Sequence, residues 1–200
     1  NRARQHERGG EASRRRFKNY PQDHPALTMT RTALSYLFLS VILVLAQVIV
    51  FNHVSLFGVA VPFVFIYVIC SLPLTLNQNW ALTAGFLLGL SVDIFSDTQG
   101  LNALGSTIIA GARHGIIKLY FPREEDMTDT RPSIQTLGIG VYVRYALTLS
   151  LLYCSVVLIA DCFTFFNPVR LLIGIASSTL LTTSLLIALD YLISKSEKRL

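Results

Sequence analysis

The sequence predicts an all-α membrane protein, a bundle of six transmembrane helices with the N- and C-termini in the cytoplasm. Of its 200 residues, 52% are hydrophobic and 14% are charged, whereas soluble proteins carry about 25% charged residues. The apolar residues fall in runs close to the ~20 residues that cross a bilayer as a helix. Fourteen of the 17 Arg and Lys residues lie in residues 1–31, 118–131 and 195–199, which six spans place on one side, as the positive-inside rule requires.

A basic tail precedes the predicted bundle. Residues 1–28 are polar and rich in arginine, a composition typical of disordered segments. Most of the net charge of +5 lies there and not on a folded basic face with aromatic residues, so we expect no nucleic acid as a partner. Because Met29 stands just before the first apolar run, the tail is either a native cytoplasmic segment or lies upstream of the native start. Residues 29–200 form the predicted six-helix transmembrane domain.

The first two predicted helices span residues 33–51 and 62–76. The chain between them stays apolar, which predicts a turn in the membrane interface. Pro62 would stand in the first turn of the second helix, where a missing N–H group is tolerated. The polar residues 77–79 then turn the chain back.

The third predicted helix, residues 81–95, carries Gly85, Gly89 and Asp93 at intervals of four residues. This spacing keeps the three near one helix face, so a neighbouring helix can approach the glycines and meet the acid. The expected partner of Asp93 is a hydroxyl, a backbone group at a helix end or another subunit. In the alternative interpretation, the glycines are ordinary packing and Asp93 marks the helix end near the headgroups.

The fourth predicted helix, residues 101–119, follows a loop that ends at Gly100. Gly111 and Gly115 predict a second face of close approach on this helix. The same helix carries Arg113 and His114 within the membrane, and two polar side chains at that depth need an explanation.

The fifth and sixth predicted helices span residues 134–160 and 169–193 and include Arg144 and Asp190, respectively. Arg113 and Arg144 each lie about eight residues, or ~12 Å, from the predicted cytoplasmic ends of their helices. They either extend toward the headgroups or face the bundle interior or a partner. Asp190 is the acid best placed to meet one of them.

The sequence contains no assembly of residues that predicts catalysis. Nucleophile–base sets, paired carboxylates, phosphate-binding glycine loops and metal-ligand spacings cannot be composed from it. The three cysteines predict neither a metal site nor a disulfide framework. We therefore expect a protein that is not an enzyme and that has no cofactor or metal.

The ordered set Phe57-Gly58-Val59-Ala60-Val61-Pro62-Phe63, Gly85 to Asp93, and Gly100-Leu101-Asn102-Ala103-Leu104 resembles the MreD family of bacterial rod-shape-determining membrane proteins, over roughly residues 29–193. Pro62, Gly85, Gly89, Asp93 and Gly100 match its pattern, whereas Phe63 stands where the family often has a polar residue.

The resemblance implies a multi-pass protein of the bacterial cytoplasmic (inner) membrane. It would act as a scaffold in cell elongation, associating with MreC and supporting peptidoglycan synthesis and cell shape. It would work with RodA and a class B penicillin-binding protein, indirectly with MreB filaments, and in contact with membrane lipids.

A second function stays open at this point. Six-span proteins of this size with a glycine-rich third helix also resemble the substrate-binding subunits of energy-coupling factor transporters, whose fold MreD itself resembles. Such subunits take up vitamins and commonly dock their transport module through a small-x-x-x-small pattern in the first helix. The first predicted helix here carries bulky residues along most of its length.

Overall fold

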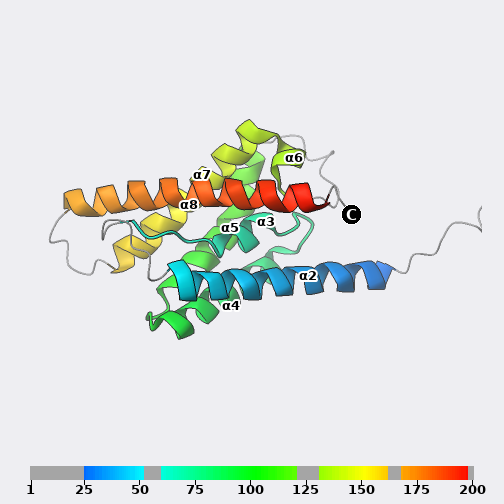
Figure 1. Cartoon of the computed structure of the whole chain (residues 1–200), viewed down its shortest axis with the longest axis horizontal. Helices are drawn as coiled ribbons and strands as arrows, with labels where there is room; N and C mark the ends of the chain where they lie inside the picture. Colours follow the sequence, from blue (N-terminus) through cyan, green and yellow to red (C-terminus); the bar gives the residue numbers. More distant parts are fainter. Residues whose placement is uncertain (1–24, 52–59, 121–130, 162–167, 198–200) are drawn as a thin grey trace, which may run out of the picture. The chain divides into compact units, whose positions relative to one another are not determined.

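The computed structural model describes residues 25–51, 60–120, 131–161 and 168–197. The chain divides into two units, residues 1–37 and 38–200, and the boundary falls within the first described helix, α2 (Pro25–Ala46). The described part of the first unit is the beginning of α2 (Figure 1). The remaining description concerns the second unit.

Helices account for most of the second unit (Figure 1). After α2 these are the π-helical turn η1 (Gln47–Phe51), α3 (Ile66–Ser71), α4 (Gln78–Ser96), α5 (Leu101–Tyr120), α6 (Ile134–Leu137), α7 (Ile139–Asp161) and α8 (Pro168–Glu197).

Three of the described helices are long and apolar enough to cross a membrane: α4, α7 and residues 168–195 of α8. Their outer faces expose large apolar side chains such as Ile94, Leu151 and Leu180, which is the surface that lipid tails require. The chain is therefore a membrane protein. Six spans and the side of each terminus remain predictions.

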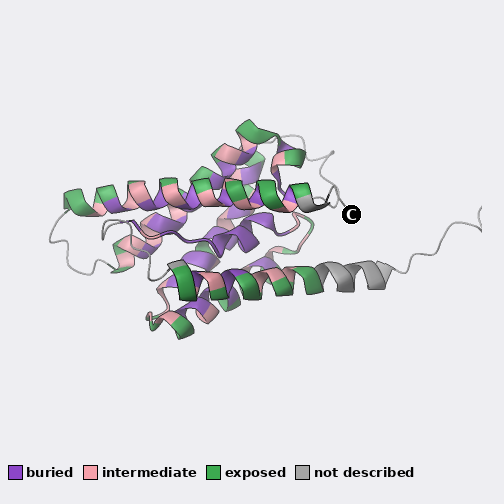
Figure 2. Ribbon diagram, in the orientation of Figure 1, coloured by how far each residue is buried: buried purple, intermediate pink, exposed green. Residues whose placement is uncertain are grey.

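The second predicted helix is wrong. Pro62 and Phe63 are not helical, and α3 has only six residues, or about 9 Å, far short of the ~30 Å bilayer core. The helix ends early because Leu72 precedes Pro73 and takes an extended conformation, with ψ 138°, as residues before proline tend to do. Every residue of α3 is buried (Figure 2).

The fifth predicted helix is interrupted. Gly138 has φ +77° and ψ 153°, a conformation that ends the short helix α6 and starts α7 anew. Arg144 is therefore the sixth residue of its helix, about 7.5 Å from the start and closer to that end than predicted.

The other predicted helices are confirmed as helices, with shifts at their ends that are small except at the start of the first. The third begins at Gln78, because the Asn77 side chain accepts a hydrogen bond from the Asn79 N–H and caps the helix. The helix predicted from residue 33 begins at Pro25, inside the range assigned to the tail. Residues 1–24 lie outside the described residues.

The helices pack in sequence order around α3. Helix α4 runs against α5, α5 against α7, and α7 against α8, while α3 contacts α4, α5 and α7. Aromatic rings fill the interior, with the centroids of Phe63 and Tyr153 4.9 Å apart in an edge-to-face arrangement. The centre of the unit is therefore occupied by a short, buried stretch of chain.

Candidate functional site: the α4–α5 joint and the central segment

The contact between α4 and α5 depends on two glycines. A Cβ atom on Gly85 would lie 2.8 Å from the Cβ of Ala110, and one on Gly89 would lie 2.6 Å from the Cα of Ala103. Side chains cannot be accommodated at such distances without moving the α5 backbone. The predicted close approach is confirmed, and the approaching helix belongs to the same chain.

Asp93 binds the beginning of α5. Its carboxylate accepts hydrogen bonds from the backbone N–H groups of Asn102 (3.1 Å) and Ala103 (2.8 Å), from the Asn102 side-chain amide (2.9 Å) and from the Thr98 hydroxyl. These N–H groups have no partner within their own helix, and the positive end of the helix dipole favours a carboxylate. Asp93 thus has two of the expected kinds of partner, a hydroxyl and backbone groups at a helix end.

A tight turn brings the acid to that position. Asp97 adopts a left-handed conformation at φ 54°, and Gly100 has φ +79°, which only glycine adopts at little cost. Asn102 then accepts a 2.5 Å hydrogen bond from the Tyr153 hydroxyl of α7. We refer to one set of residues as the α4–α5 joint: Gly85, Gly89, Asp93, Gly100 and Asn102.

The sequence analysis missed one close helix contact, at Gly105. It also predicted a close approach at Gly111 and Gly115 that the structure does not contain. A Cβ on Gly105 would lie 2.8 Å from the ring of Tyr153, so this glycine admits α7; no spacing in the sequence pointed to it. Gly111 has only ordinary neighbours, with Leu82 Cδ2 3.4 Å from a built Cβ, and Gly115 has none within 4 Å.

The second site is the central segment, residues 60–73, which runs through the interior and is non-helical before and after the short helix α3. Polar side chains from η1 and α8 satisfy its non-helical part. The hydrogen bonds join Val61 N–H to Ser178 Oγ (3.0 Å), Phe63 N–H to Thr182 Oγ1 (3.1 Å), Val64 N–H to Gln47 Oε1 (2.8 Å), and Gln47 Nε2 to the Pro62 carbonyl (3.0 Å).

This arrangement has a physical requirement behind it. Non-helical backbone within a membrane protein persists only where other groups satisfy its polar atoms. The sequence analysis placed Pro62 in a helical turn. It lies instead in the non-helical part, where its carbonyl accepts from Gln47.

Arg113 binds the other end of the central segment. Its guanidinium is fully buried and donates to the carbonyls of Leu72 (2.7 Å) and Pro73 (3.0 Å). These carbonyls follow α3, where a helix leaves acceptors unpaired and its dipole favours a cation. Of the two predicted alternatives, Arg113 therefore faces the bundle interior.

Asp190 plays a corresponding role from α8. It is fully buried and accepts hydrogen bonds from the Tyr67 hydroxyl (3.1 Å) and from the Ile134 backbone N–H at the start of α6 (2.8 Å). Its hydrogen-bond partners are thus a tyrosine and a backbone amide, where the sequence analysis expected an arginine. A helix start offers a carboxylate the same compensation that an arginine would.

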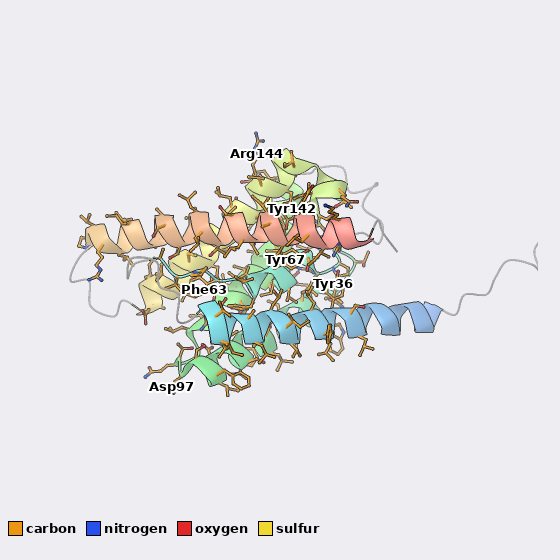
Figure 3. All side chains as sticks on the ribbon, in the orientation of Figure 1. Tyr36, Phe63, Tyr67, Asp97, Tyr142 and Arg144 are labelled. Atoms are coloured by element: carbon orange, nitrogen blue, oxygen red, sulfur yellow. The ribbon has the colours of Figure 1, made fainter. Side chains whose placement is uncertain are left out.

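The two other polar residues that were predicted to lie within the membrane, His114 and Arg144, are less buried than Arg113 and Asp190. His114 is half-buried, and Arg144 is exposed on α7, where Figure 3 shows its side chain pointing away from the helices. Within the parts of the chain that the structure describes, no group of three or more His, Cys, Asp or Glu residues could hold a metal ion.

Comparisons with known protein families, with characterised proteins and with solved structures found no match for this chain.

Proposed function

We propose that this chain is a non-enzymatic scaffold subunit of the bacterial cell-elongation complex, similar to MreD. In this proposal it lies in the cytoplasmic membrane with six spans, associates with MreC, and supports peptidoglycan synthesis by RodA and a class B penicillin-binding protein. Its link to MreB filaments would be indirect.

One observation carries the proposal. Gly85, Gly89, Asp93 and Gly100, which form most of the pattern that resembles MreD, all belong to the α4–α5 joint. The two glycines admit α5, the acid caps it, and Gly100 permits the turn between the helices. A pattern whose members serve one joint is more informative than the same residues scattered through a bundle.

The interior polar groups favour a scaffold as well. Arg113 and Asp190 both bind backbone groups at helix ends, so their charges fix the path of the chain. Buried groups that are satisfied in this way stabilise one shape, which is what a protein that positions others requires.

The partner surface must lie outside the joint, because α5 already occupies the glycine face of α4. In this proposal a membrane helix of MreC packs on the outer face of α5. There Gly115 is exposed with nothing within 4 Å of a built Cβ, and Leu119 is 75% exposed. A small residue at such a position allows two membrane helices to approach closely.

Co-purification tests the proposal. The tagged full chain is extracted from membranes of rod-shaped bacteria, and MreC is measured beside it for the wild type and for Gly115→Leu. We expect Gly115→Leu to lower the recovered MreC, because the added side chain holds the helices apart. Gly140→Leu is the matched control, since Gly140 on α7 is also exposed and open.

The two functions give different results in this experiment. A wild-type chain that captures an ATPase module and no wall-synthesis protein would establish the transporter alternative. Equal recovery of MreC with both variants, at equal protein levels, would remove the α5 face from the proposal.

A further inference from the structure

Arg144 is exposed on α7. Arg113 donates to two carbonyls in the interior, whereas the Arg144 guanidinium has no hydrogen-bond acceptor among the residues that the structure describes. Only the Arg144 carbonyl is engaged, by the Thr148 hydroxyl at 2.8 Å. Arginine keeps its charge in proteins, so this exposed cation is available to an anion from outside the described residues.

The surroundings of Arg144 are those of a lipid-facing surface. On the same helix, Ile139 is 67% exposed and Leu151 is 43% exposed. Helix α7 is one of the three that are long and apolar enough to cross a membrane. A charged side chain on such a face is costly at the bilayer centre and much less so near the boundary.

The direction of the side chain leads toward that boundary. Arg144 lies about 7.5 Å from the first residue of α7, and Cα–Cβ bonds in an α-helix tilt toward its N-terminus. The guanidinium can therefore extend toward the headgroup region at that end while its methylene stem stays among apolar groups.

Open space lies along this path. Gly140 stands one turn before Arg144, on the same helix face, and it is exposed with nothing within 4 Å of a built Cβ. A side chain at position 140 would stand beside Arg144, on the N-terminal side toward which the arginine side chain extends. Glycine instead leaves room for a bulky oxyanion.

We propose that Arg144 and the space over Gly140 form a binding site for the phosphate of an anionic phospholipid, such as phosphatidylglycerol. The planar guanidinium donates in parallel to two phosphate oxygens. The acyl chains lie along the exposed apolar residues of α7. This site is independent of the proposed function, because it requires only that α7 lies in a bilayer.

The test uses the purified full chain in detergent, titrated with dioleoylphosphatidylglycerol or dioleoylphosphatidylcholine and examined by native mass spectrometry for bound lipid. We expect the wild type to prefer phosphatidylglycerol. Arg144→Gln should weaken the binding of one phosphatidylglycerol molecule by about tenfold, the effect of losing a hydrogen-bonded charge pair. The affinity of Arg144→Lys for phosphatidylglycerol should lie between those of the wild type and Arg144→Gln, because lysine keeps the charge and loses the paired donors.

Two further variants separate this site from general charge effects. Arg170→Gln removes another exposed arginine, at the start of α8, and should leave phosphatidylglycerol binding unchanged. Gly140→Leu keeps Arg144 but fills the space beside it, and should weaken binding. The thermal midpoint without lipid should not fall below that of the wild type in any of the four variants, since both arginines and Gly140 are exposed.

Four results would overturn the proposal. These are equal phosphatidylglycerol binding by the wild type and Arg144→Gln, equal loss in Arg170→Gln, and displacement of the lipid by millimolar inorganic phosphate. The fourth is loss of a co-purifying protein from Arg144→Gln with lipid binding intact, which would assign the arginine to an acidic partner.

Discussion

Asp93 illustrates how a single carboxylate can fix two helices at once. It projects from α4 and binds the first N–H groups of α5, so the loop between the helices is held by a side chain that precedes it. Intramembrane acids are expensive unless they are compensated, and a helix start supplies both donors and a favourable dipole. The sequence predicted this kind of partner but not its identity, because the turn that returns α5 to Asp93 depends on backbone angles at Asp97 and Gly100.

At Asp93 we predict that Asp93→Asn lowers the stability of the purified chain by about 0.5–2 kcal/mol, the usual cost of losing a helix cap. Asparagine offers one acceptor oxygen in place of two and presents an N–H₂ group to N–H donors. Asp93→Leu should cost more, because it leaves those donors buried without an acceptor. The thermal midpoint in detergent measures both. Asp97→Asn is the control, since Asp97 is exposed and asparagine tolerates its left-handed conformation; a comparable loss there would contradict the role of Asp93.

Two glycines on neighbouring helices should respond differently to the same change. Gly89→Ala puts a Cβ against the α5 backbone and should lower the thermal midpoint. Gly115→Ala meets open space and should leave the midpoint unchanged or raise it, because alanine favours a helix by about 0.8–1.0 kcal/mol over glycine. A thermal melt of each variant in the same detergent decides. Equal effects would mean that α4 and α5 do not approach as closely as described.

At the scale of the element, the central segment shows why a hydrophobic run need not be a membrane span. Residues 60–73 have the composition of a transmembrane helix, but apolar side chains suit a protein interior as well as they suit lipid. The distinguishing feature lies elsewhere in the chain, in the polar groups Gln47, Ser178 and Thr182 that bind the segment. Helices α5 and α8 could be predicted because Gly100 and Pro168 mark where they begin.

The accessibility of Cys70 should depend on the hydrogen bonds that Arg113 donates just after α3. Arg113→Met leaves the carbonyls of Leu72 and Pro73 without their donor, and the loss at Leu72, which is buried, costs about 1–3 kcal/mol. The end of α3 should then open more often. With Cys154 and Cys162 replaced by serine, we expect a membrane-permeant maleimide to label Cys70, which is 1% exposed, faster in Arg113→Met than in the parent chain. Arg144→Met should leave the labelling rate unchanged, and faster labelling in both would assign the effect to a general loss of charge.

At the scale of the whole molecule, the pairing of α4 with α5 sets where the ends of the two helices lie. Gln78, the first residue of α4, reaches the middle of α5 with its side chain, which donates to the Gly111 carbonyl at 2.9 Å. The last nine residues of α5, about 13.5 Å, extend beyond that point to Tyr120. The order of these helices followed from the sequence, but the register of their contact did not, because it is set by contacts between side chains and backbone that no local pattern encodes.

The pairing of α4 with α5 makes a prediction about membrane topology. Single cysteines at Asp97 and Leu119 should react with an impermeant maleimide from opposite sides of the membrane, because they stand at opposite ends of the α4–α5 pair. A cysteine at Asn79 should react from the same side as Leu119→Cys, since it stands in the first turn of α4, at the end away from Asp97. Labelling of Asn79→Cys from the side of Asp97→Cys would contradict a membrane-crossing α4.

The long-range bonds of the central segment also constrain the order in which the protein can be made. Val61, Phe63 and Tyr67 bind residues that follow them by 117, 119 and 123 positions. A ribosome releases residue 61 long before it reaches α8, so the segment leaves the insertion machinery with Gln47 already made but without Ser178 and Thr182. Until the last helix arrives, the amide groups of Val61 and Phe63 lack these acceptors. Assembly of the protein is therefore completed from its C-terminal end, and a nascent chain that stops short of α8 is expected to be recognised by membrane quality control.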